Sequence, residues 1–204
     1  MSNHIYRTEG VVLSSLPDGE ANRYLRIFTK ELGLIGGTAR SVREGRSKLR
    51  YGLADYSVSL VSLVRGREVW RVVNAVPLWN AYSEFKADAP RLRAALRLLS
   101  LVGKLLAGEG KHEELYSTLT ESLEFLRLEP LPRGELASFQ LIAALRILFL
   151  LGYAEDRQNF APFVPPLAGT GYTHELLSSF APLHAEARAS IERALAATQL
   201  AHRL

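Results

Sequence analysis

The spacing of apolar residues changes once along this 204-residue chain, near Pro77, and that change limits the possible folds more than any other feature. Before it, short runs of alternating apolar and polar residues predict β-strands. After it, apolar residues recur at the three- and four-residue spacings typical of helices. Strands followed by helices predict an α+β fold. We place the domain boundary at residue 78, with a strand domain over 1–78 and an all-helical domain over 79–204.

Five short strands are expected in the first domain, at residues 6–16, 22–29, 34–39, 55–64 and 68–76. In the fourth of them, Val58 and Leu60 alternate with serines, but the phase of the apolar positions flips at Val61. A β-bulge or a sharp bend produces such a flip. Five short, bent strands fit a small closed barrel, so we predict a five-stranded OB-fold β-barrel.

Four helices are expected in the second domain, at about 88–106, 112–127 and 135–151 and from Pro182 onward. Asp88 is suited to cap the first of them, with Pro90 in the first turn. Residues 135–151 are apolar nearly all round, which predicts a central helix buried by its neighbours. Residues 154–172 are rich in proline and glycine, and we expect an irregular segment there.

Several classes of function are excluded by what the chain lacks. It has no cysteine, which excludes disulfides, thiol catalysis and Cys-ligated metals. His174-Glu175 is not followed by the second histidine of a zinc protease, and Gly33–Gly37 lacks the Lys-Ser/Thr of a phosphate-binding loop. We expect no enzymatic activity, no metal and no cofactor. Without an apolar leader or a run long enough to span a bilayer, we expect a cytoplasmic protein with no membrane contact.

Positive charge is concentrated in the first half of the chain. Through Tyr82, twelve Lys and Arg residues stand against seven Asp and Glu; beyond it, thirteen stand against fourteen. A surface that faces a polyanion has this asymmetry, although solubility alone would also explain it. The densest segment is residues 40–50, which combine one glutamate with Arg40, Arg43, Arg46, Lys48 and Arg50.

A flexible, exposed loop of this composition can follow a phosphate backbone, because Arg forks pair with phosphate oxygens. Arg7, Arg23 and Arg26 lie on the neighbouring predicted strands, and Tyr24 is a candidate for stacking on a base. We therefore predict a nucleic-acid interface formed by these residues. Three alternatives stay open: a solvated loop whose charges do nothing, an OB-fold RNA-binding module, and a protein–protein adaptor that binds no nucleic acid.

The order of six motifs resembles the N-terminal barrel of the RecO family of bacterial recombination mediators. These motifs are Glu9–Leu13, Gly19–Arg23, Ile27–Leu34, Ala39–Arg43, Ser47–Arg50 and Leu63–Trp70. The similarity is specific over about residues 5–80 and is weaker but collinear up to residue 154.

The resemblance implies a mediator of recombinational repair that binds single- and double-stranded DNA and anneals complementary strands. It implies loading of a recombinase onto DNA coated with single-strand-binding protein (SSB), together with a RecR-type partner, at the nucleoid. The family's DNA-contacting cations would correspond to Arg40, Arg43, Arg46, Lys48 and Arg50, and also to Arg7 and Arg23.

Many relatives carry a four-cysteine zinc module just after the position that corresponds to Tyr153. This chain has the Pro- and Gly-rich segment 154–172 in its place, without cysteine, so we expect no zinc. The resemblance also implies a pocket for the acidic, apolar C-terminal tail of SSB. Such a pocket needs an apolar groove with one or two cations, whose residues the sequence does not identify.

Overall fold

A computed structural model describes residues 4–164 and 171–198, and these form two compact units. The first unit comprises the residues up to 87 together with 106–113, and the second comprises 88–105 and the residues from 114 onward. Positions 165–170, within the segment predicted to be irregular, lie outside the described residues. Each unit has its own core and is described separately below.

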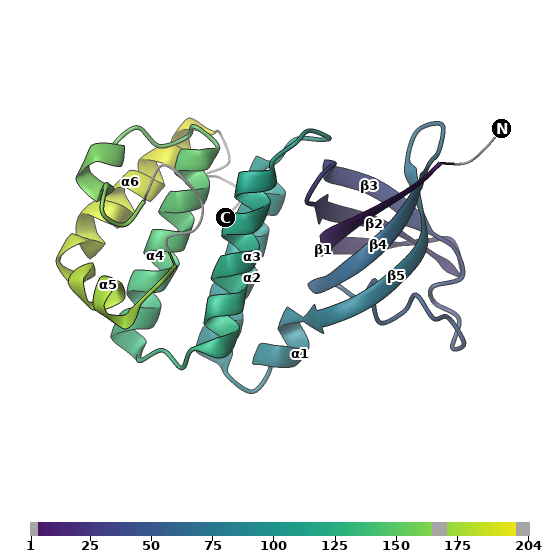
Figure 1. The fold of residues 1–204 in the computed structure, drawn as a ribbon, viewed down its shortest axis with the longest axis horizontal. Helices are drawn as coiled ribbons and strands as arrows, with labels where there is room; N and C mark the ends of the chain where they lie inside the picture. The colour runs from purple at the N-terminus through teal and green to yellow at the C-terminus, as the bar shows by residue number, and fades with distance from the viewer. Residues whose placement is uncertain (1–3, 165–170, 199–204) are drawn as a thin grey trace. The chain divides into compact units, whose positions relative to one another are not determined.

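The first unit is a closed barrel of five strands (Figure 1). The strands are β1 (Ile5–Asp18), β2 (Asn22–Thr29), β3 (Gly33–Ala39), β4 (Ser57–Arg65) and β5 (Trp70–Asn80). Around the barrel they run in the order β1-β2-β3-β5-β4, and all neighbouring pairs are antiparallel except β3 with β5. This architecture confirms the predicted OB-fold barrel followed by helices.

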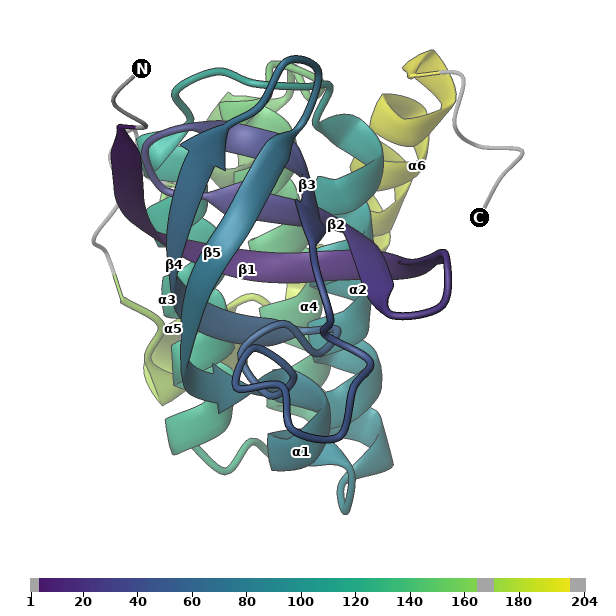
Figure 2. The ribbon, with the colours of Figure 1, turned by 90° about the vertical axis from the view of Figure 1, so that its right-hand side faces the viewer.

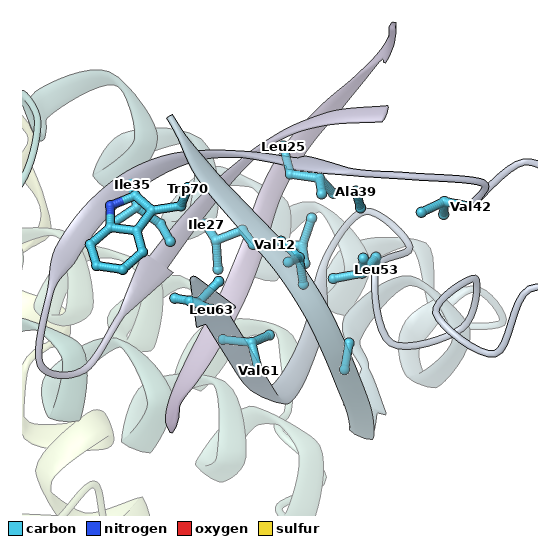
Figure 3. Close-up of a cluster of buried hydrophobic side chains, with 12 residues drawn as sticks. Val12, Leu25, Ile27, Ile35, Ala39, Val42, Leu53, Val61, Leu63 and Trp70 are labelled. Carbon is cyan, nitrogen blue, oxygen red and sulfur yellow. The ribbon is translucent and has the colours of Figure 1, made fainter. Parts of the chain in front are cut away.

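Inward-facing apolar side chains fill the barrel (Figure 3). In β2, Leu25 and Ile27 are fully buried while Arg26 between them is exposed, as the two-residue period of a strand requires. Val12 of β1 and Leu63 of β4 complete the centre of the same cluster. Two residues outside the strands, Val42 and Leu53, also belong to it.

The change of apolar phase seen in the sequence of β4 does not come from an extra residue in that strand. β4 pairs with β1 in continuous register from Val58 to Val64, and the register shifts in the β4–β5 pair pass over Val73 and Leu78 of β5. Ser57 and Ser59 are fully buried, on the same side as Val61 and Leu63. The inward face of β4 therefore begins with two serines and continues with apolar residues, without a change of face.

The second unit consists of helices, with α4 (Arg133–Leu150) at its centre. The other helices described are α2 (Ala89–Leu105), α3 (Glu113–Leu128), α5 (His174–Ser179), α6 (His184–Ala197) and two short 3₁₀ turns, η1 (Arg157–Phe160) and η2 (Ala181–Leu183). The four predicted helices correspond to α2, α3, α4 and α6. Two short helices were not predicted: α5, and α1 (Ala81–Phe85), which belongs to the first unit.

Arg146 attaches the described part of the irregular segment to α4. It is 8% exposed, and its Nε donates to the carbonyl of Phe163 at 2.9 Å. Its guanidinium lies 4.3 Å from the centre of the Tyr172 ring, whose hydroxyl is 2.7 Å from Ser122 Oγ of α3. These two contacts compensate the buried guanidinium in part, while its Nη2 is buried without a hydrogen bond to the residues that the structure describes.

Candidate nucleic-acid interface

The segment between β3 and β4 contains the basic loop, defined here as residues 40–50, at the lower end of the barrel in Figure 2. Near the start of the loop, Ser41 has a φ of 55°, which lies in the left-handed region. The Ser41 amide donates to Asn22 Oδ1 at 3.1 Å, and the Arg43 amide donates to the carbonyl of Ala21 at 3.0 Å. These two bonds fix the start of the loop to the β1–β2 turn and to the first residue of β2.

Apolar residues anchor the loop to the barrel. Val42 and Leu53 are buried in the barrel core, and Leu49 packs against it. Ser57 Oγ donates to the carbonyl of Tyr51 at 3.1 Å, and Ser59 Oγ donates to the carbonyl of Gly52 at 2.7 Å. The inward serines of β4 therefore satisfy carbonyls of the covering segment, which explains why they occupy core positions.

The cations of the basic loop point to solvent. Arg40, Arg46, Lys48 and Arg50 are all exposed, and none of their side chains has a hydrogen bond or an ion pair with the residues that the structure describes. Arg43 differs, because its Nη1 donates to the carbonyl of Gly19 at 3.0 Å. The loop predicted to be flexible is thus a series of hydrogen-bonded turns that holds its positive charges outward.

The remaining predicted cations lie apart from one another on the barrel. Arg23 donates to Ser15 Oγ at 3.1 Å, and Ser15 donates to Asp55 at 2.6 Å, so Arg23 is part of a polar network beside the loop. Arg26 is exposed on the outer face of β2. Arg7 pairs in register with Ser62 of β4 and shares a surface cavity with Lys30 and two glutamates. The structure therefore brings the five loop cations together with the β1–β2 turn but does not bring Arg7 to them.

The aromatic side chains near this surface differ in how much of each ring is accessible. Tyr24 is half-buried and its ring lies over Gly36 of β3. Phe28 is fully buried and has no surface on which a base could stack. Tyr51, directly after the basic loop, is 76% exposed. Of these three residues, Tyr51 offers the largest open face.

Sequence reasoning missed Arg71 on β5. It is exposed, and it lines a shallow groove together with Arg40. The signal was the two-residue period of the strand, in which the inward Trp70 and Val72 flank an outward arginine. Arg65, six residues earlier, is already compensated: its Nη1 lies 2.6 Å from the carboxylate of Glu109, and its guanidinium lies over the Trp70 ring.

Two histidine pairs lie in the helical unit. His184 Nε2 is 2.8 Å from Ser138 Oγ. Burial, aided by Arg188, lowers the pKa of His184 below its ordinary value, and Ser138 is 1% exposed, so the pair fastens α6 to α4 and does not present a nucleophile. His174 Nδ1 is 2.5 Å from Glu135. Among residues 4–164 and 171–198, no cluster of three or more His, Cys, Asp or Glu could hold a metal.

The helical unit carries an apolar surface groove of about 410 Å³ between α2, α4 and α6. Leu98 and Leu101 line it from α2, Leu141 from α4 and Ile191 from α6. Arg97 lies in the lining and donates to Gln140 Oε1 at 3.3 Å. The groove therefore combines apolar walls with one exposed cation. In the part of the chain that the structure describes, no helix is long and apolar enough to cross a bilayer.

Comparison with known proteins covers both units. Residues 1–78 match the family described as recombination protein O N terminal, and residues 86–159 match the family described as recombination protein O C terminal. The DNA repair protein RecO of Nostoc sp. is 33% identical over 143 residues, which cover 70% of this chain and 47% of the relative.

The RecO protein of Rubrobacter xylanophilus is 30% identical over 170 residues, which cover 82% of this chain and 65% of the relative. The RecO protein of Gloeothece citriformis is 31% identical over 128 residues, which cover 63% of this chain and 45% of the relative. The chain thus spans about half to two thirds of the length of these relatives. With a closed five-stranded barrel, a helical unit and matches over both, the chain belongs to the RecO family.

Proposed function

We propose that this chain acts in DNA repair by binding the phosphate backbone of DNA through the basic loop. One observation carries the proposal: Arg40, Arg46, Lys48 and Arg50 stand exposed and without carboxylate partners among the described residues, on a loop that Val42 and Leu53 anchor to the barrel core. Cations held in place and left uncompensated suit an external polyanion, because binding then requires little reordering of the loop.

The proposed mechanism involves binding alone, with no chemistry on a covalent bond. Two DNA strands repel each other, and a cationic surface between them lowers that repulsion, which favours annealing of complementary strands. We extend the proposal to the loading of a recombinase onto SSB-coated DNA with a RecR-type partner. Support for this extension comes from the relatives, which are named DNA repair proteins. Such a role would place the protein at the nucleoid, in the cytoplasm.

The two units would divide this work, with DNA on the barrel and protein partners on the helices. The groove between α2, α4 and α6 is the proposed site for the acidic, apolar tail of SSB. Its apolar walls suit the hydrophobic side chains of such a tail, and Arg97 suits its carboxylates. The irregular segment 154–172 would replace the zinc module of relatives without a metal.

The test is a charge-reversal variant with a matched control. We expect Arg46→Glu, Lys48→Glu and Arg50→Glu together to weaken binding to single- and double-stranded DNA by at least about a hundredfold at low salt, and to slow annealing. The dependence of log K on log salt should become shallower by about 2 for a single strand, since three phosphate contacts are lost.

The control carries the same change of net charge on the helical unit, as Arg93→Glu, Arg133→Glu and Arg188→Glu, all of which are exposed. It should bind DNA nearly as the wild type does. Equal losses in the two variants would reject the basic loop as the site. Wild-type protein that binds no DNA at low salt would favour a protein–protein adaptor, and a preference for single-stranded RNA would favour an RNA-binding module.

A further inference from the structure

A groove opens on the barrel surface where β3 and β5 separate. These two strands pair in parallel at Gly37–Trp70 and Thr38–Arg71, and the groove, with a volume of about 380 Å³, is lined from Thr38 and Arg40 on one side to Arg71 and Val73 on the other. Its volume falls in the range typical of small-ligand sites. It borders the basic loop, because Arg40 and Leu49 belong to both.

The apolar part of the groove is set by a bulge in β5. Ser62 pairs with Asn74 and Leu63 pairs with Val72, which leaves Val73 as the extra residue. A bulge redirects the side chain of the extra residue, and Val73 is 49% exposed. Together with Leu49, Val64 and Val72, it gives the groove an apolar wall.

The polar part of the groove has no internal compensation. Arg40 and Arg71 both line it, and neither guanidinium makes a hydrogen bond or an ion pair with the residues that the structure describes. The hydroxyl of Thr38 is likewise without a hydrogen bond to the described residues. Two like charges that share a groove repel each other, and a bound anion would relieve that repulsion.

We infer that this groove binds one unpaired nucleotide of a DNA single strand. Arg40 and Arg71 take the phosphate, and the exposed side chain of Val73, together with Leu49, takes the face of the base. The inference rests on the proposed function, since the basic loop must first hold the strand. A base in a duplex is stacked and paired, and moving it out of the stack costs free energy that an unpaired base does not require. The groove therefore adds a preference for single strands to a loop that reads only phosphates.

The test compares Arg71→Gln with Arg67→Gln. Both remove one positive charge from an exposed side chain of the barrel, but Arg67 lies in the β4–β5 turn and does not line the groove. Binding is measured by fluorescence anisotropy at one salt concentration. The probes are a single strand, the matching duplex, and a single strand with the same phosphates but with abasic sites in place of most bases.

For the wild type, we expect the abasic strand to bind at least about fivefold more weakly than the normal strand. Arg71→Gln should weaken binding of the normal single strand by about fivefold and change duplex binding by less than about twofold. Arg67→Gln should change binding of the single strand and binding of the duplex by the same factor. A 2-aminopurine base in the normal strand should change its fluorescence on binding to the wild type and change it less with Arg71→Gln.

Equal losses for single strand and duplex with Arg71→Gln, or an abasic strand that binds as tightly as the normal one, would overturn the inference and leave the proposed function intact. Failure of the proposed function looks different: the charge-reversal variant of the basic loop would then bind both DNA forms as the wild type does. Circular dichroism of Arg71→Gln checks that the barrel is folded.

Discussion

Ser41 occupies a backbone conformation that L side chains seldom adopt, with φ at 55°, and one side chain from strand β2 holds it there. Asn22 Oδ1 accepts the Ser41 amide at 3.1 Å. Removing that acceptor with Asn22→Ala should lower the free energy of unfolding by about 1 kcal/mol. It should also weaken DNA binding at unchanged net charge, because the basic loop then loses its fixed start.

Chemical denaturation and DNA titration of the same samples measure both effects. Adding Ser41→Gly to Asn22→Ala should recover much of the lost stability, since glycine adopts positive φ without a steric cost. If Asn22→Ala matches the wild type in both measurements, the Asn22 side chain does not set the loop geometry.

The residue scale also shows how far the site could be predicted from sequence. The five loop cations all lie between residues 40 and 50, so the sequence identifies them as a group. The structure places them on one loop. The partners that orient this loop are Gly19 of the β1–β2 turn and Asn22, the first residue of β2. Arg71 lies beside Arg40 of the basic loop because β5 pairs with β3 at Thr38. Such long-range proximity depends on strand order, which periodicity does not encode.

At the scale of single elements, α5 is held by a titratable contact. Its first residue, His174, lies with Nδ1 2.5 Å from Glu135 of α4 and with Nε2 3.7 Å from Glu129. The hydrogen bond to Glu135, followed by the charge of that carboxylate, raises the pKa of His174 above its ordinary value of 6.5. Because the folded pKa is the higher one, the contact is fully present below pH 6.5 and is lost as the pH rises through the folded pKa.

We therefore expect the α5 amides to exchange faster with solvent, relative to those of α4, as the pH rises above 6.5, after correction for the intrinsic pH dependence of exchange. His174→Gln should remove this extra dependence, because glutamine does not titrate in that range. Hydrogen exchange followed by NMR measures both variants, and a chemical-shift titration gives the pKa of His174 directly. A His174 pKa at or below 6.5 would contradict the prediction.

The elements that sequence predicted well are the long ones. α2, α3 and α4 each span 16 to 18 residues, enough to repeat an apolar stripe several times. α5 has six residues, too few to repeat an apolar stripe. The sequence signal for this helix is instead its N-cap, Thr173, whose Oγ accepts the Leu176 amide. β4 was misinterpreted for another reason: Ser57 and Ser59 face inward because they bind the carbonyls of Tyr51 and Gly52, which an apolar pattern cannot reveal.

For the whole molecule, the proposed division of labour makes DNA binding and SSB-tail binding separable. The uncompensated cations of the basic loop lie in the barrel unit, whereas the apolar groove of α2, α4 and α6 lies wholly in the helical unit. Arg97 is the exposed cation of that groove, and Arg93 lies one turn earlier on α2, is also exposed and does not line the groove. Arg97→Glu and Arg93→Glu supply a matched test, since each changes the charge of α2 by the same amount.

We expect Arg97→Glu to weaken binding of a short acidic, apolar peptide that ends in a free carboxylate by at least about tenfold, because a charge-assisted contact becomes a repulsive one. Arg93→Glu should weaken it far less, and both should bind DNA as the wild type does. The charge-reversal variant of the basic loop should show the converse, with peptide binding retained and DNA binding lost. Calorimetry with the peptide and anisotropy with DNA measure each of the three variants. If Arg97→Glu and Arg93→Glu weaken peptide binding alike, the peptide responds to the overall charge of α2 and does not occupy the groove.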